Sequence, residues 1–256
     1  MEVIFKKEGA VAYVLINREK AHNALNSGVM ERLEEIFAQL EDDCEVMVVV
    51  IRGAGEKAFV AGADLKEIKD AGKRRPELIR KGQDILAKIR NSSKVVIAAV
   101  NGYALGGGLE LALACDIRIA SENAKFALPE AKLGLMPGYG GTQLLPRLVG
   151  IGKAKYIILS GKMITAGDAL QFGLVEKVCS SERLMEEVAE LAEKISANGP
   201  LSIRACKRAI DAGMQLPIDD ALELELEEYA KVALSSDAEE GMAAFLEKRT
   251  ADFKGR

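Results

Sequence analysis

The sequence predicts an α/β fold of strands backed by helices, followed by a C-terminal region that contains only helices. Two apolar runs rich in β-branched residues, at 46–53 and 94–100, are typical of strands that are buried on both faces. Beyond about residue 181 no further strand pattern occurs, and four helical patterns follow, separated by Gly-Pro, Pro and Ser-Ser-Asp breaks. We therefore expect a core over residues 1–197 and a helical region over residues 198–256.

The remaining elements follow in chain order. Residues on either side of a Glu8-Gly9 turn alternate between apolar and other types, which predicts a hairpin that enters the sheet. Residues 27–41 carry apolar side chains at helical spacing after a serine cap. A third strand pattern lies at 116–121. Strands and helices that alternate in this way are the signature of an α/β fold.

The composition excludes several classes of protein. The chain has 256 residues and is 49% hydrophobic, which is enough for one large domain or two smaller ones. Its 35 Lys and Arg against 39 Asp and Glu leave a net charge of -4, so no general attraction to nucleic acid or an anionic membrane is expected. Four separated cysteines and one histidine offer no metal cluster, and reduced thiols fit a cytoplasmic location.

Residues 95–115 are nearly all apolar and about as long as a membrane span. The stretch contains Asn101, Glu110 and several glycines, and a charge at the centre of a spanning helix is costly in lipid. A buried strand followed by a buried helix is the better interpretation. The first ten residues do not have the pattern of a signal peptide. We expect no contact with a membrane.

Two glycine-containing breaks are candidates for a binding site. A short strand ends at Ala61-Gly62-Ala63, and a buried strand runs into Gly106–Gly108, where a helix begins. The N-terminus of a helix leaves N–H donors unpaired, so one donor from each break would form an oxyanion hole. Close packing of helix on sheet also explains glycines here. The G-x-G-x-x-G spacing of a dinucleotide site is absent.

Two glutamates accompany these breaks. Glu110 lies three residues after Gly107, among apolar residues, and stands about one helical turn from the anion-binding end. Glu130 follows Pro129 at the start of a short predicted helix. Taken singly, either could be a helix-start acid or an ion-pair partner. Two carboxyl groups in opposite protonation states could instead serve as a general base and a general acid.

Three ordered segments carry a resemblance to a known family. They are AGADLKE at 61–67, NGYALGGGLELALACD at 101–116 and FALPEAKLGLMPGYGGTQLLPRLVG at 126–150. The chain resembles the crotonase (enoyl-CoA hydratase/isomerase) family over nearly its whole length. The resemblance implies a spiral of repeated ββα units, with residues 1–197 as the catalytic core. It also implies that the C-terminal helices assemble a trimer, or a hexamer as a dimer of trimers, and close the active site.

The resemblance also implies roles at the site. The backbone N–H groups of Ala63 and Gly107 would hold the thioester oxygen of an acyl-CoA, and Glu110 and Glu130 match the two catalytic glutamates of hydratases. Isomerases of the family lack one or both, so the pair favours enoyl-CoA hydratase activity, a hydro-lyase reaction. We assign the water to Glu110 and the α-proton to Glu130, although a shared or swapped role stays open. Gly138 matches a position whose backbone helps to hold the water.

Coenzyme A, as part of the substrate, has its own candidate residues, and no separate cofactor is expected. Near the adenine and phosphates, the candidates are Ala61, Asp64, Leu65, Lys66 and, for a phosphate, Lys20. Phe245 and Lys248 are three apart in the last helical pattern and so would share a face. They match residues that reach the coenzyme A of a neighbouring subunit; packing of Phe245 in the core is the alternative.

Several alternatives stay open. Within the family, an isomerase or another lyase competes with a hydratase, because a fold does not settle a function. A scaffold or RNA-binding relative would need no glutamate pair, and RNA binding would need a basic stripe. A serine hydrolase on a related spiral fold would have to use His22 as its base. Acyl chain length, the direction of use in fatty acid metabolism such as β-oxidation, and a pocket or packing role for Tyr139 are also open.

Overall fold

The computed structural model describes residues 1–256 and contains two sheets. The larger has six strands in the order β1-β2-β3-β5-β7-β10, and the smaller has four in the order β4-β6-β8-β9. In the larger sheet only β1 and β2 pair antiparallel, around the Gly9 turn; the other neighbours are parallel. The bounds are β1 Val3–Glu8, β2 Val11–Ile16, β3 Val48–Gly53, β4 Ala58–Val60, β5 Val95–Val100, β6 Tyr103–Leu105, β7 Ile117–Ser121, β8 Lys125–Ala127, β9 Ile164–Thr165 and β10 Lys177–Cys179.

The order of the strands shows that the chain winds as a spiral. Each of three successive passes places one strand in the larger sheet and the next strand in the smaller one: β3 then β4, β5 then β6, β7 then β8. Helices follow each pass, so the repeat is strand, strand, helix, as expected. Since both sheets keep the same order of passes, the ends of β4, β6 and β8 lie side by side.

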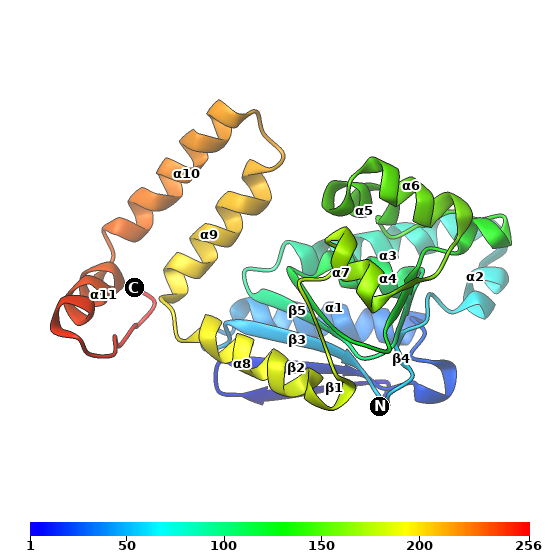
Figure 1. Ribbon diagram of the computed structural model, residues 1–256, viewed down its shortest axis with the longest axis horizontal. Coiled ribbons are helices and arrows are strands. Elements are labelled where there is room, and N and C mark those ends of the chain that lie inside the picture. Colours follow the sequence, from blue (N-terminus) through cyan, green and yellow to red (C-terminus); the bar gives the residue numbers. More distant parts are fainter.

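Helices cover both faces of the larger sheet. On one face of the sheet, alternate residues of β3 and β5 pack against α8, in a cluster with Leu184 and Val188. On the other face, the remaining residues of these strands join the main core, which includes α1 and α3 (Figure 1). The helices of the core are α1 Ser27–Asp42, α2 Leu65–Ala71, α3 Arg75–Arg90, α4 Gly107–Ala114, α5 Gly141–Val149, α6 Ile151–Ser160, α7 Ala166–Phe172 and α8 Leu184–Ser196, with short 3-10 turns at Glu19–Ala21, Gly72–Arg74, Glu130–Leu133 and Ser181–Arg183.

The last three helices form an arm that projects from the core (Figure 1). They are α9 Pro200–Gly213, α10 Ile218–Ala233 and α11 Ser236–Glu247. The arm carries many exposed apolar side chains, among them Leu222, Leu226 and Tyr229 on α10. An apolar face of this extent is characteristic of a surface that another chain covers.

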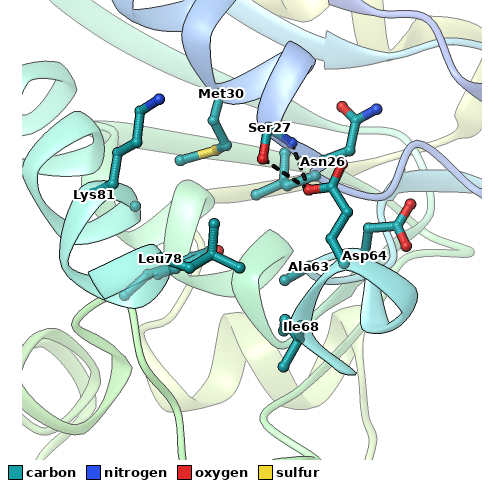
Figure 2. A pocket seen from close by; sticks show the side chains of 12 residues that line it. Asn26, Ser27, Met30, Ala63, Asp64, Ile68, Leu78 and Lys81 are labelled. Atoms are coloured by element: carbon teal, nitrogen blue, oxygen red, sulfur yellow. Dashed lines mark hydrogen bonds between the residues drawn. The ribbon is translucent and has the colours of Figure 1, made fainter. Parts of the chain in front are cut away.

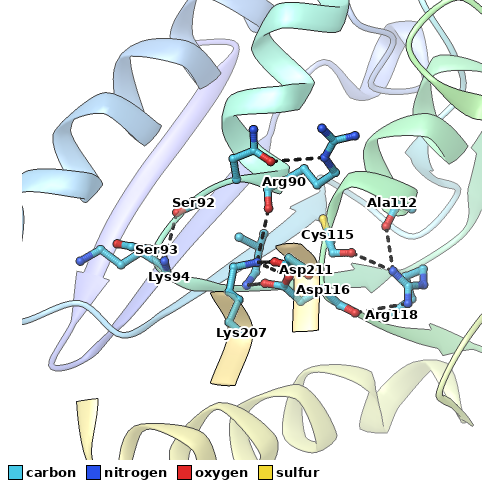
Figure 3. Close-up of polar contacts among 12 residues, drawn as sticks. Arg90, Ser92, Ser93, Lys94, Ala112, Cys115, Asp116, Arg118, Lys207 and Asp211 are labelled. Atoms are coloured by element: carbon cyan, nitrogen blue, oxygen red, sulfur yellow. Dashed lines mark hydrogen bonds and ion pairs between the residues drawn. The ribbon is translucent and has the colours of Figure 1, made fainter. Parts of the chain in front are cut away.

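One partly buried ion pair helps to hold the arm to the core. The Lys207 ammonium of α9 pairs with the Asp116 carboxylate just before β7, and Asp211 approaches the same ammonium at 3.2 Å (Figure 3). The Lys207 ammonium also donates to the Arg90 carbonyl at the end of α3. Burial raises the pKa of Asp116, although Lys207 partly offsets this. Breaking such a pair would leave a partly buried charge without a partner, so the pair holds α9 in place beside the start of β7.

Four sequence expectations need correction. The cap of α1 is Asn26, whose side chain accepts from the Val29 N–H, and not a serine. The stretch after β5 contains a further strand, β6, before the helix begins. Lys248 lies just beyond α11 in the left-handed region at φ 55°, so it does not continue the helical face of Phe245. The Glu-rich run at 223–228 is predicted from the sequence to be a solvated helix face, but Glu228 on α10 is buried and paired with Lys231.

Two further expectations concern cysteines and membranes. All four cysteines are free thiols, and burial raises the pKa of the Cys115 thiol to about 12. None of the helices combines the length and the apolar character that crossing a membrane would require. The apolar stretch at 95–115 is divided between two strands and a short helix inside the core.

Candidate active site

The two glycine-containing breaks predicted from the sequence meet in the structure. Strand β4 pairs with β6 in parallel, so the segment after Val60 and the segment after Leu105 leave the same edge of the small sheet. A β-carbon added to Gly107 would lie 3.3 Å from the Ala63 nitrogen. A β-carbon on Gly108 would lie 2.0 Å from the Val60 carbonyl oxygen. Glycine is therefore required for α4 to approach β4 this closely.

This meeting point offers two backbone donors. The Ala63 N–H makes no hydrogen bond within the chain, whereas the neighbouring Asp64 N–H donates to the Leu25 carbonyl. Gly107 is the first residue of α4, and the first N–H groups of an α-helix have no acceptor within it. The two amides are neighbours, since a β-carbon on Gly107 would lie 3.3 Å from the Ala63 nitrogen, and the N-terminus of α4 favours a negative charge there.

Glu110 is fixed beside this point by the loop that leads into α5. Its Oε1 accepts from the Tyr139 and Gly141 N–H groups, each at 2.7 Å, and only 1% of the residue is exposed. Gly141 is the first residue of α5, so the carboxylate lies at the N-terminus of that helix. Burial nevertheless dominates and, helped by the charge of Glu130, raises the pKa of Glu110 to about 7.

Glu130 also lies near this point, at the start of the 3-10 turn after β8. Its Oε1 would lie 2.8 Å from a β-carbon on Gly106, which adopts φ 51°, so the carboxyl group rests against the residue before the Gly107 N–H. Its Oε2 is buried and has no hydrogen-bond partner. Burial raises the pKa of Glu130 as well. A protonated carboxyl group with a free oxygen can deliver a proton into the site.

The loop before α1 holds the Ala63 segment in place. Leu25 and Ala63 form an isolated parallel bridge, and the Ala61 N–H donates to the His22 carbonyl. The buried Asn23 amide donates to the Ala54 and Ala58 carbonyls on either side of the turn into β4. Both His22 and Asn23 have positive φ, a conformation that costs energy outside glycine. The surrounding hydrogen bonds offset that cost.

The candidate coenzyme A residues of the core lie at and near the N-terminus of α2. Asp64 caps this helix through the Lys66 N–H and pairs with Arg18 at 3.2 Å. Burial alone would raise the pKa of Asp64, but the bonds from Arg18 and the backbone lower it. Leu65 and Lys66 are exposed, as is Lys20 in the turn before His22, while Ala61 and Gly138 are half-buried.

Phe245 and Lys248 do not join this group within one chain. Both belong to the C-terminal arm, which projects from the core away from α4 (Figure 1). Phe245 is 83% exposed, so it is not a core residue of its own subunit. Within one chain these two residues lie apart from the other candidate site residues.

Sequence reasoning missed the two amides that hold Glu110. It singled out Gly138, whose carbonyl accepts from Gln83 at 2.7 Å, whereas the amides of Tyr139 and Gly141 bind the carboxylate. Gly140 between them adopts φ 116°, which favours glycine. The run Gly-Tyr-Gly-Gly before a helix was the available signal. The spacing alone could not show that this run binds Glu110, about 30 residues earlier in the chain.

Taken together, the arrangement suits one type of chemistry. Two carboxyl groups with raised pKa values flank a point where two N–H groups can bind an oxygen that gains negative charge. Addition of water to, or its removal from, a double bond conjugated with a carbonyl group requires these three functions: a base, an acid and an oxyanion hole. No group of three or more His, Cys, Asp and Glu side chains is arranged to hold a metal ion.

Comparison with known proteins identifies the family. The sequence model described as enoyl-CoA hydratase/isomerase matches residues 6–256. The chain belongs to the enoyl-CoA hydratase/isomerase family. It is 47% identical to the short-chain-enoyl-CoA hydratase of Clostridium acetobutylicum, over 99% of this chain and 98% of that protein. It is 44% identical to the crotonyl-CoA hydratase of Syntrophomonas wolfei, over 98% and 97%.

A solved structure agrees with this family assignment. The enoyl-CoA hydratase of Bacillus anthracis superposes with a TM-score of 0.98 and 41% identity, over 100% of both chains. The predicted crotonase-like spiral is thus confirmed. The serine hydrolase alternative finds no support in the structure, because the exposed His22 side chain makes no hydrogen bond to a serine.

Proposed function

We propose that this protein is an enoyl-CoA hydratase, which reversibly adds water to a trans-2-enoyl-CoA and gives a 3-hydroxyacyl-CoA. One observation carries the proposal: the buried carboxyl group of Glu110, the half-buried carboxyl group of Glu130 and two backbone donors converge where β4 and β6 end. The relatives from Clostridium acetobutylicum and Syntrophomonas wolfei are named as hydratases of short-chain enoyl-CoA and crotonyl-CoA. Those names support a hydratase that acts on short acyl groups.

The proposed mechanism assigns each group a role. The thioester oxygen accepts from the Ala63 and Gly107 N–H groups, which stabilise the enolate-like charge that develops as water attacks the β-carbon. Each such donor contributes about 3 kcal/mol in comparable oxyanion holes. Glu110, as a carboxylate, takes a proton from the water, and Glu130, as the acid, protonates the α-carbon on the same face. The unpartnered Oε2 of Glu130 supports this assignment.

Coenzyme A would lie along the entrance. We propose that Ala61, Asp64, Leu65 and Lys66 contact its adenine end and that Lys20 meets a phosphate as a point charge. The exposure of Lys20, Leu65 and Lys66 beside the oxyanion hole supports this placement. The backbone of Gly138, next to the amides that bind Glu110, would help to hold the water. Residues 1–197 would then form the catalytic core. The reaction itself would require no further cofactor.

The arm would complete the site from a neighbouring chain. We propose that residues 198–256 assemble a trimer or a hexamer and that Phe245 and Lys248 contact the coenzyme A of an adjacent subunit. The exposed apolar residues of α9, α10 and α11 support this assembly, because a monomer would leave them in water. Free thiols support a cytoplasmic location, and the reversible reaction suits either direction of fatty acid metabolism, including β-oxidation.

Product analysis tests the proposal against the isomerase alternative. Purified protein is incubated with crotonyl-CoA and, separately, with cis-3-hexenoyl-CoA, and the products are analysed by mass spectrometry. A hydratase converts crotonyl-CoA into a product heavier by the mass of one water molecule. An isomerase converts the 3-enoyl thioester into a 2-enoyl thioester of unchanged mass. Conversion of the second substrate without hydration of the first would overturn the proposal.

A further inference from the structure

The ring of Tyr139 occupies a narrow space beside the oxyanion hole. A β-carbon added to Gly107 would lie 3.2 Å from its Cδ2 and Cε2 atoms and 3.3 Å from the Ala63 nitrogen. One edge of the ring is therefore next to the two backbone donors. The residue is only 7% exposed, and burial raises the pKa of its hydroxyl to about 12.

The other edge of the ring packs against α3. A β-carbon on Gly82 would lie 2.2 Å from Cε1 and 2.7 Å from Cζ of Tyr139, which is an impossible contact. Glycine inside a helix is less stable than alanine, so its presence here is explained by the space that the ring needs. The backbone of residue 139 is also fixed, because its N–H binds Glu110. The ring thus spans the distance from α4 to α3 and has no room to turn toward α3.

A cavity lies beside this ring. Its walls come from the start of α1, from Ala63 and Asp64, from α2 and from α3, and Tyr139 forms part of the wall. Met30, Ile68 and Leu78 are the apolar side chains around it in Figure 2. At its polar edge Glu67 accepts from the Ser27 N–H and Oγ, at 2.8 and 2.9 Å. An acyl chain that continued past Tyr139 would reach this cavity.

We infer that Tyr139 is the end wall of the acyl site and restricts the enzyme to short, unbranched 2-enoyl groups such as crotonyl. The inference rests on the proposed hydratase function and adds the residue that sets its preference for short acyl groups. A four-carbon acyl group needs room for only one methyl group beyond the double bond that reacts. A longer chain meets the ring, which Gly107, Gly82 and the bond to Glu110 hold in place.

The test compares kcat/KM for crotonyl-CoA and trans-2-decenoyl-CoA in the full-length enzyme. Wild type is expected to prefer crotonyl-CoA by more than about tenfold, since poorly fitting methylene groups cost this much or more. Tyr139→Ala opens the cavity, so kcat/KM for decenoyl-CoA rises and the preference falls by at least about tenfold. Tyr139→Phe keeps the ring and hence the preference. Tyr156→Ala, a truncation of a half-exposed tyrosine on α6, serves as the matched control and changes neither value.

Gly82 supplies an independent check. Gly82→Ala forces the ring toward the oxyanion hole. When this substitution is made alone, kcat/KM for crotonyl-CoA should fall at least about tenfold. When it is combined with Tyr139→Ala, it should lower kcat/KM little further. Thermal unfolding verifies that each variant is folded, and Tyr139→Leu replaces Tyr139→Ala if the latter does not fold. If wild type hydrates both substrates equally well, or Tyr139→Ala leaves the preference unchanged, the inference is overturned while the hydratase function stands. If wild type hydrates neither, the proposed function itself fails.

Discussion

At the scale of single residues, Glu110 is held between two opposing effects. The N-terminus of α5 and the amides of Tyr139 and Gly141 favour its carboxylate, whereas burial in the core favours the neutral acid. Burial is the larger effect and raises the pKa to about 7. A general base whose pKa lies near neutral pH exists in both forms during the reaction cycle, as reversible hydration requires.

The raised pKa of Glu110 predicts a stability that depends on pH. In the unfolded chain Glu110 ionises near 4.5, so between about 4.5 and 7 the folded state binds more protons and loses stability as pH rises. The full shift corresponds to at most about 3 kcal/mol. Glu110→Gln removes this cost and can still accept the two N–H bonds. We expect its free energy of unfolding to exceed that of wild type by about 2–3 kcal/mol at pH 8, and the gain to vanish near pH 4.5.

Denaturant unfolding of both proteins across this pH range measures the difference. Because all other titratable groups are common to the two proteins, the comparison isolates Glu110. A variant that is less stable than wild type at pH 8, or a difference that stays constant with pH, would show that the buried carboxyl group keeps an ordinary pKa.

The roles of Glu110 and Glu130 could be proposed from the sequence because their types and positions follow recognisable breaks. The hydrogen-bond and packing partners around these residues could not be predicted from the sequence. The bond from the Tyr139 amide, the space at Gly82 that admits the ring and the Ser27–Glu67 contact all join residues far apart in the chain. Only the folded spiral brings such residues together.

At the scale of elements, the approach of α4 to β4 positions both backbone donors. This approach depends on Gly108, where a β-carbon would lie 2.0 Å from the Val60 carbonyl oxygen. A backbone atom cannot move away as a flexible side chain could. The close contact therefore fixes the start of α4, and with it the Gly107 N–H, relative to Ala63.

Gly108→Ala is expected to destabilise the fold by at least about 2–3 kcal/mol, since the added methyl group forces helix and strand apart. Gly152→Ala is the matched control, because a β-carbon at Gly152 on α6 meets no atom within 4 Å. The control should be neutral or stabilise the protein by up to about 1 kcal/mol. Thermal unfolding of the two variants compares them directly. Equal stability of Gly108→Ala and wild type would mean that α4 does not need its close approach to β4.

The long elements were predicted well because burial patterns repeat over many residues. The helix expected at 27–41 and the strands expected at 46–53 and 94–100 lie within one or two residues of α1, β3 and β5. Strand β6 was not predicted, because a segment of three residues is too short for an alternating pattern to be recognised. The end of α11 was also missed, because no residue type at this position indicates that the backbone of Lys248 adopts the left-handed conformation.

At the scale of the whole molecule, the arm has more apolar surface than its own chain covers. Leu222, Leu226 and Tyr229 are all exposed and follow a spacing of four and three residues along α10, so they share one face. The arm is fixed to the core by the Lys207–Asp116 pair, which presents this face in a defined direction. Sequence patterns predicted the three helices, but the direction of the arm depends on contacts outside them.

The double variant Leu222→Asp with Leu226→Asp is expected to be monomeric, because it places charges on the face that a second copy would cover. Light scattering after gel filtration measures the mass, with a trimer or hexamer expected for wild type. Leu170→Asp on α7, a half-exposed leucine outside the arm, should keep the wild-type mass. A monomeric wild type, or an unchanged mass in the double variant, would contradict the proposed role of the arm.

The hydration of crotonyl-CoA, followed by the loss of absorbance of its conjugated double bond, tests the central claim most directly. Wild type is compared with Glu110→Gln and Glu130→Gln, which keep the shape of each side chain but cannot exchange a proton. The account predicts rapid turnover by wild type and a loss of about two to four orders of magnitude in each folded variant. Full activity in either folded variant, or an inactive wild type, would contradict the account.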